Sequence, residues 1–145
     1  MRAKPIPAFF YGLFMDPSVL ARKGVHVTDP KVARLDGYRL SIGARATLVR
    51  DPTETVYGIV MQVFADDLMR LYSDDGVRDY RPQAVRVVQG DGRTIEATCY
   101  SLPPPLEQVK PNAEYADELY SLAKRLGLPD AYLAEIARAG AGHGA

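Results

Sequence analysis

The sequence predicts an α+β fold in which mainly antiparallel strands precede two C-terminal helices. Strand-like segments follow one another between residues 32 and 64, and a further pair lies between residues 80 and 101. After Asn112, apolar residues recur at helical spacing. Strands that follow each other through short turns pair antiparallel, so these three observations together indicate the α+β class.

The size of the chain favours a single domain. It has 145 residues, of which 47% are hydrophobic, and a chain of this size buries about two-thirds of its unfolded surface in one core. The triple proline at residues 103–105 is too short to separate two cores. We therefore expect one domain over residues 1–139 and a small, polar, disordered tail at residues 140–145.

Charge and cysteine usage exclude several classes of partner. The 18 basic and 18 acidic side chains are scattered, so nucleic acid is not expected as a partner. No apolar stretch is long enough for a signal segment or a membrane span, which predicts a cytoplasmic protein without membrane contact. A single cysteine, Cys99, excludes an intrachain disulfide, and two histidines without ligand spacing predict no metal site.

The first half of the chain opens with a strand, a loop and a helix. The aromatic run at residues 8–11 predicts a buried strand that ends at Gly12. Asp16-Pro17 supplies an N-cap and a first helical position, and Gly24 ends that short helix at about Lys23. Strands are then expected at residues 32–42, 46–49 and 56–64, with a turn at residues 50–53 and a short helix at residues 66–72.

The second half predicts a hairpin and two helices. Residues 80–88 and 94–101 read as strands joined across Gly90-Asp91-Gly92. The prolines at 103–105 predict an extended connection. A helix is then expected between Asn112 and Gly127, and another from Pro129-Asp130 towards Ala139.

Two short segments carry polar groups suited to ligand chemistry. At the turn of Tyr11, Gly12, Leu13 and Phe14, unpaired backbone N–H groups could bind a carboxylate, or Gly12 could simply supply a bend in the core. In Asp74-Asp75-Gly76, burial of one acid would raise its pKa towards general-base function, although Asp-Asp-Gly is also a common exposed turn.

Other polar residues carry weaker signals. Tyr80 and Tyr115 could donate to a bound carboxylate or be half-buried packing residues. Arg45 and Arg50 could pair with an anionic ligand or be solvated at strand ends. Cys99 has no histidine nearby in sequence and is predicted to be a buried apolar residue.

Four stretches, taken in order, resemble the gamma-glutamylcyclotransferase-like superfamily over roughly residues 9–136. The loop at residues 10–15 is similar to that family's Tyr-Gly-Ser-Asn/Leu loop, and residues 56–60 (VYGIV) to its Val-Trp-Gly-Val-Val strand. Residues 71–77 (LYSDDGV) resemble its Leu-Asp-x-x-Glu-Gly-Val, and residues 127–132 (GLPDAY) its Gly-Leu-Pro-x-x-Tyr.

The resemblance implies a fold and a reaction. The fold would be a small mixed, mainly antiparallel β-barrel with flanking short helices. The activity would be cyclisation of a gamma-glutamyl amide to 5-oxoproline with release of the amine, without a cofactor. The substrate would be a gamma-glutamyl amino acid, a glutathione-like peptide or a gamma-glutamylamine, and the protein would be a monomer or a homodimer.

By motif position, the resemblance implies roles for particular residues. Asp75, or less favourably Asp74, corresponds to the family's general base. The backbone of Tyr11, Gly12, Leu13 and Phe14 would bind the substrate, and the tyrosines 80 and 115 would line the pocket. Because an aspartate replaces the family's glutamate and Leu13-Phe14 replaces polar residues, a noncatalytic binding or regulatory protein that keeps the fold and pocket is the alternative hypothesis.

Overall fold

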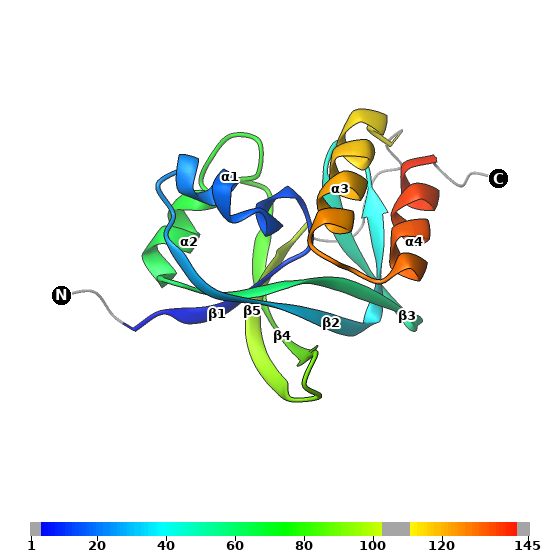
Figure 1. Cartoon of the computed structure of the whole chain (residues 1–145). Helices are drawn as coiled ribbons and strands as arrows, with labels where there is room; N and C mark the ends of the chain where they lie inside the picture. Colours follow the sequence, from blue (N-terminus) through cyan, green and yellow to red (C-terminus); the bar gives the residue numbers. More distant parts are fainter. Residues whose placement is uncertain (1–3, 103–110, 142–145) are drawn as a thin grey trace.

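The fold is a closed five-stranded β-barrel flanked by short helices. A computed structural model describes residues 4–102 and 111–141, and Figure 1 shows two groups of helices beside the strands of the barrel. The strands follow the order β1-β3-β2-β4-β5 around the barrel. Their bounds are β1 Ile6–Phe10, β2 Val27–Ile42, β3 Ala46–Val63, β4 Arg81–Gln89 and β5 Thr94–Ser101.

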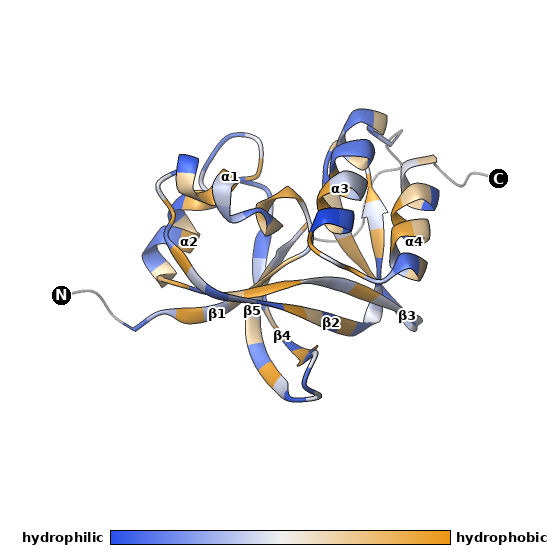
Figure 2. Ribbon diagram, viewed as in Figure 1, coloured by the Kyte–Doolittle hydropathy of each residue, from blue (hydrophilic) through white to orange (hydrophobic). Residues whose placement is uncertain are grey.

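The helices pack at two separate places on the barrel. The helix α1 (Pro17–Arg22) and the helix α2 (Ala65–Leu71) lie together, preceded by a single 3-10 turn, η1, at Leu13–Met15. The antiparallel pair α3 (Ala113–Arg125) and α4 (Asp130–Ala141) lies at the other place. In Figure 2 these helices are two-sided, with hydrophilic and hydrophobic residues on different faces, as surface helices require.

Pairing in the barrel is antiparallel except at one position. β1 is antiparallel to β3, with Ile6 opposite Val63, but it meets β5 in parallel at Ala8 and Thr98. β2 pairs with both β3 and β4, and β4 pairs with β5 along the hairpin. The mixed, mainly antiparallel barrel implied by the resemblance is therefore confirmed.

Several predicted elements differ in extent from the structure. β3 runs without a break through residues 50–53, where a turn was predicted. The prediction of two separate strands at residues 46–49 and 56–64 is therefore wrong. The pairing of β2 with β3 shifts between Asp36 and Tyr38, so Asp51-Pro52-Thr53 bulges out of the ladder, where the missing proline N–H costs no strand hydrogen bond. β2 also begins five residues earlier than predicted, at Val27.

The C-terminal helix is longer than predicted. The tail was expected from residue 140, but α4 continues to Ala141, because Gly140 lies so close to Ala116 of α3 that the two helices pack together there. Residues 142–145 of that predicted tail, and the extended connection predicted at residues 103–105, lie outside the described residues.

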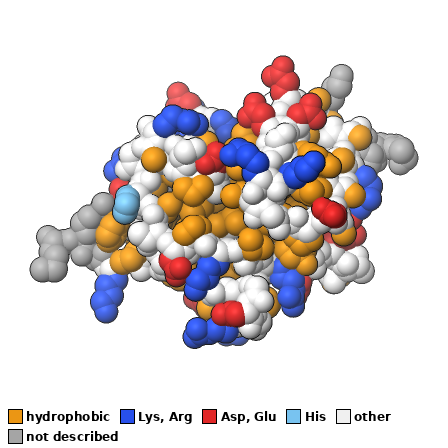
Figure 3. Space-filling view, in the orientation of Figure 1, with side chains coloured by type: hydrophobic (Ala, Val, Ile, Leu, Met, Phe, Trp, Pro, Cys, Tyr) orange, Lys and Arg blue, Asp and Glu red, His pale blue; other side chains and the backbone are white. Residues whose placement is uncertain are grey.

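A continuous hydrophobic cluster fills the barrel and extends under the helices. Phe9, Met61, Val87 and Cys99 are almost fully inaccessible to solvent, which confirms Cys99 as a buried strand residue. Figure 3 shows that apolar side chains also gather across the middle of the visible face, with charged side chains around them. None of the described helices is long and apolar enough to span a membrane.

The crossing of β1 and β3 depends on the absence of a side chain at Gly58. A Cβ at this position would collide with the carbonyl oxygen of Phe10 and would lie 2.9 Å from the ring of Phe9. We predict that Gly58→Ala lowers the free energy of unfolding by about 3 kcal/mol, because the strands cannot separate without opening the barrel. Urea denaturation measures this change.

The matched control for this prediction is Gly90→Ala. A Cβ at Gly90 meets nothing within 4 Å, so we expect a change within about 0.5 kcal/mol. Equal stabilities for the two variants would contradict the role given to Gly58.

Candidate active site

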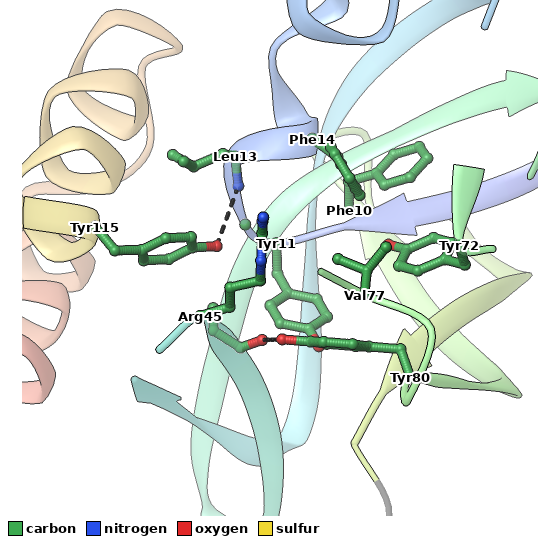
Figure 4. A pocket seen from close by; sticks show the side chains of 11 residues that line it. Phe10, Tyr11, Leu13, Phe14, Arg45, Tyr72, Val77, Tyr80 and Tyr115 are labelled. Carbon is green, nitrogen blue, oxygen red and sulfur yellow. Dashed lines mark hydrogen bonds between the residues drawn. The ribbon is translucent and has the colours of Figure 1, made fainter. Parts of the chain in front are cut away.

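A pocket opens at one end of the barrel, where β1 passes into η1. Its lining comes from five parts of the chain, and Figure 4 shows these side chains from close by. The lining residues are Phe10, Tyr11, Gly12, Leu13, Phe14, Arg45, Ala46, Tyr72, Val77, Tyr80 and Tyr115. All six residues predicted to bind substrate, namely Tyr11, Gly12, Leu13, Phe14, Tyr80 and Tyr115, therefore surround one pocket.

Backbone N–H groups form one wall of this pocket. η1 begins at Leu13, and the first amides of a helical turn have no partner within it. The N–H of Leu13 donates to the Tyr115 hydroxyl over a long 3.4 Å. In the described part of the chain, the N–H groups of Gly12 and Phe14 have no acceptor, so this wall offers free donors to an anion or a carbonyl oxygen.

Tyr115 is positioned by the cap of its helix. The Asn112 side chain accepts a hydrogen bond from the Tyr115 N–H at 3.1 Å and so caps α3. Asn112 also ties α3 to the β2–β3 turn, because its backbone N–H donates to the carbonyl of Gly43 at 2.9 Å. The Tyr115 hydroxyl then lies directly against Gly12, where a Cβ would come within 2.6 Å of it.

Aromatic rings form the opposite side of the pocket. Tyr72 stacks on Tyr100 with ring centres 3.9 Å apart, and Phe14 meets the edge of Tyr72 at 5.6 Å. Tyr80 donates a hydrogen bond to the carbonyl of Ala46, and Tyr11 donates one to the carbonyl of Tyr100 at 2.8 Å. These contacts fix the rings and leave their hydroxyl groups close to the pocket.

The tyrosine hydroxyls stay protonated at neutral pH. Burial raises the pKa of Tyr115, although hydrogen bonds with the backbone of Ala46 and Leu13 and the Arg45 charge oppose it. Burial also raises the pKa of Tyr80. The nearby Tyr115 raises it further, and the positive charge of Arg45 lowers it. The Tyr115 hydroxyl accepts from Leu13 and can donate its own proton to a ligand, whereas the Tyr80 proton is already donated to the Ala46 carbonyl, and both groups are poor bases.

The predicted carboxylates lie outside the pocket. The Asp75 side chain is 97% exposed and pairs with Arg78 at 3.5 Å. Asp74 is 61% exposed and pairs with Lys23 at 3.6 Å. The Val77 N–H donates to the Asp74 carbonyl, and this turn directs Val77 inward. The burial of one of these acids, which general-base function was expected to require, is absent in this conformation.

Five lining residues were not among the predicted site residues, namely Phe10, Arg45, Ala46, Tyr72 and Val77. Tyr72 lies at the end of α2, beside the predicted acidic turn, and no local pattern distinguishes it from a core residue. Arg45 was weighed as an anion partner, and it comes to the pocket because the β2–β3 turn places it there. Of the lining residues, Arg45 alone is largely exposed.

The pocket is small in this conformation. Its cavity measures about 30 Å³, which is room for a water molecule rather than for an amino-acid derivative. A ligand of that size requires a lining group to move, and the exposed Arg45 and the turn that contains Val77 are the parts with the least packing around them. Among the described residues, no cluster of side chains has the geometry of a metal site.

Buried tyrosines make the fold sensitive to alkaline pH. Burial raises the pKa of six hydroxyls above the ordinary value of 10.0, namely those of Tyr11, Tyr72, Tyr80, Tyr100, Tyr115 and Tyr132. Above pH 10 the unfolded chain releases protons that the folded chain retains. The free energy of unfolding is therefore unaffected below that pH and falls above it, by about 1.4 kcal/mol per pH unit for each tyrosine.

We predict that tyrosinate absorbance and loss of circular dichroism appear together in one cooperative step above pH 10. Complete ionisation of all tyrosines in a chain that keeps its circular dichroism would contradict the burial described here.

Comparisons with known proteins agree with the fold and the sequence motifs. Residues 55–136 match the AIG2-like family. A gamma-glutamylcyclotransferase from Bos taurus is 27% identical over 151 residues, covering 91% of this chain and 79% of the bovine protein. A solved structure of a gamma-glutamyl cyclotransferase superposes with a TM-score of 0.77 at 24% identity, over 91% of this chain and 86% of that one. YkqA from Bacillus subtilis also reaches 0.77, at 27% identity over 92% of this chain and 53% of its own. The chain belongs to the AIG2-like family and to the gamma-glutamylcyclotransferase-like superfamily.

Proposed function

We propose that this protein binds a gamma-glutamyl amide in the pocket and cyclises it to 5-oxoproline with release of the amine. The observation that carries the proposal is the row of backbone donors at Gly12, Leu13 and Phe14, which lies in the wall of one pocket together with the hydroxyl groups of Tyr80 and Tyr115. Relatives that bear the name gamma-glutamylcyclotransferase support the same activity.

The reaction is internal to the substrate. The α-amine nitrogen attacks the γ-carbonyl carbon, a new C–N bond closes a five-membered ring, and the original amide C–N bond breaks. One proton leaves the attacking nitrogen and one arrives on the departing amine. The protein accelerates this sequence by bending the glutamyl chain, binding the carbonyl oxygen as it becomes negative, and moving the proton.

The backbone donors and the tyrosines suit the first two tasks. Donors at Gly12, Leu13 and Phe14 bind the α-carboxylate and the γ-carbonyl oxygen, where a fixed N–H group stabilises developing negative charge. Because burial raises the pKa of Tyr80 and Tyr115, both stay protonated at neutral pH, and the Tyr115 hydroxyl can donate to the substrate beside these amides.

The proton acceptor in this proposal is Asp75, after a rearrangement of its turn. Val77 already lines the pocket two residues further on, so a changed turn moves the Asp75 carboxylate towards it. The contact that keeps Asp75 outside is an exposed ion pair with Arg78, and such pairs contribute little free energy. Asp74 has an exposed pair of its own with Lys23 and is the weaker candidate.

Formation of 5-oxoproline from gamma-glutamyl-alanine tests this function. We predict that Asp75→Asn lowers kcat/KM at least about a hundredfold, because general-base catalysis contributes that much. Asp74→Asn is the matched control and should retain activity within about threefold. The reaction is followed by chromatography of 5-oxoproline across a range of pH values.

The dependence on pH identifies the base. If Asp75 accepts the proton, kcat/KM falls at acidic pH in the wild type, and Asp75→Asn removes this limb of the profile. A profile that follows only the substrate's own ammonium group and is the same in both proteins would contradict the role of Asp75 while leaving the cyclisation intact.

One observation favours a second candidate function, noncatalytic binding of a gamma-glutamyl compound. None of the described residues that line the pocket carries a carboxylate. In that case calorimetry detects binding of gamma-glutamyl-alanine, but no 5-oxoproline forms, and Asp75→Asn changes neither result. Appearance of activity in Asp75→Glu alone would indicate an enzyme that has lost its base.

A further inference from the structure

Arg45 supplies a positive charge at the mouth of the pocket, and no ion pair joins it to another described residue. It stands in the turn between β2 and β3, where the Gly43 N–H donates to its carbonyl at 3.0 Å. Figure 4 shows its side chain extending from this turn towards the loop at Tyr11, with Tyr115 on one side and Val77 on the other. The guanidinium is thus part of the pocket rather than a solvated strand end.

Contacts confirm where the guanidinium lies. A Cβ on Gly76 would stand 3.0 Å from Nη2 and 3.5 Å from Nε of Arg45, so the plane of the group rests against the bare backbone of Gly76. The same charge lowers the pKa of Tyr80 and of Tyr115 against the burial that raises both. A cation and two neutral hydroxyl groups therefore share one space, and of the two the Tyr115 hydroxyl keeps its proton for a ligand.

Nothing acidic neutralises this cation within the part of the chain that the structure describes. The described ion pairs occupy other arginines, for example Arg78 with Asp75 and Arg125 with Asp16. The pocket lining within residues 4–102 and 111–141 contains no acidic side chain. An arginine beside hydroxyl donors and without a carboxylate of its own suits a ligand carboxylate, which its planar group binds through two parallel hydrogen bonds.

We propose that Arg45 binds a carboxylate on the leaving group of the ligand, so that the protein prefers gamma-glutamyl amino acids to gamma-glutamylamines. This inference rests on the proposed function, in which the backbone donors at Gly12–Phe14 bind the glutamyl part. Arg45 is the exposed lining residue, so it meets the portion of the ligand that extends towards solvent. A leaving group that carries an ammonium there is repelled.

A matched pair of substrates tests the preference. Gamma-glutamyl-alanine and gamma-glutamylethylamide differ only in the carboxylate of the leaving group. We expect wild-type kcat/KM to favour gamma-glutamyl-alanine by about tenfold to a hundredfold, because a hydrogen bond between charged groups contributes a free energy of that size. Arg45→Met should abolish this preference by lowering kcat/KM for gamma-glutamyl-alanine alone, and Arg45→Lys should retain part of it.

The control variant is Arg50→Met. Arg50 has the same charge but lies over the ring of Tyr38, 5.7 Å from its centre, outside the pocket. It should leave the ratio of the two substrates unchanged. An equal loss for both substrates in Arg45→Met, or an unaltered ratio, would overturn the assignment.

Two unreactive ligands separate this inference from the proposed function. N-glutaryl-alanine and N-ethylglutaramate lack the α-amine and cannot cyclise. N-glutaryl-alanine keeps both carboxylates, whereas N-ethylglutaramate keeps only the one on the glutaryl part. Calorimetry should show tighter binding of N-glutaryl-alanine to the wild type and equal binding of the two to Arg45→Met. This result supports the role of Arg45 even if no substrate yields 5-oxoproline. Equal affinity of the wild type for both ligands rejects the role of Arg45, whether or not the protein is an enzyme.

Discussion

The structure depends on the way in which the short strand β1 closes the barrel. β1 has only five residues, yet it pairs with β3 on one side and meets β5 on the other. The close approach of its Phe10 carbonyl to Gly58 fixes the position at which the chain leaves the end of the barrel. The residues that follow, Tyr11 to Phe14, then have no strand partner and become the donor wall of the pocket.

Local patterns predicted the ends of elements better than their lengths. Asp16-Pro17 and Gly90-Asp91-Gly92 marked the start of a helix and the turn of a hairpin correctly, because capping and turn formation involve neighbouring residues. The continuity of β3 through Pro52 could not be predicted in this way. It depends on the partner strand β2, whose register shifts opposite the proline.

The candidate site was also predicted in part, and what was missed again depends on contacts outside the motif. The loop at residues 11–14 and the tyrosines 80 and 115 were predicted and do lie together, since motif order reflects the path of the chain around the barrel. The direction of Asp75 could not be read from its motif. The backbone angles of one turn decide whether an acid faces the ligand or water. Here Arg45 lies against Gly76 of that turn, and Lys23 pairs with Asp74.

The crowding of tyrosines around the pocket also gives the protein a built-in optical reporter. The chain has no tryptophan and nine tyrosines, of which Tyr11, Tyr72, Tyr80 and Tyr115 line the pocket. Tyrosine emission is therefore not masked by a stronger fluorophore, and a large share of it originates within a few ångströms of any bound molecule. Occupancy of the pocket can be followed by ultraviolet spectroscopy on the unlabelled protein.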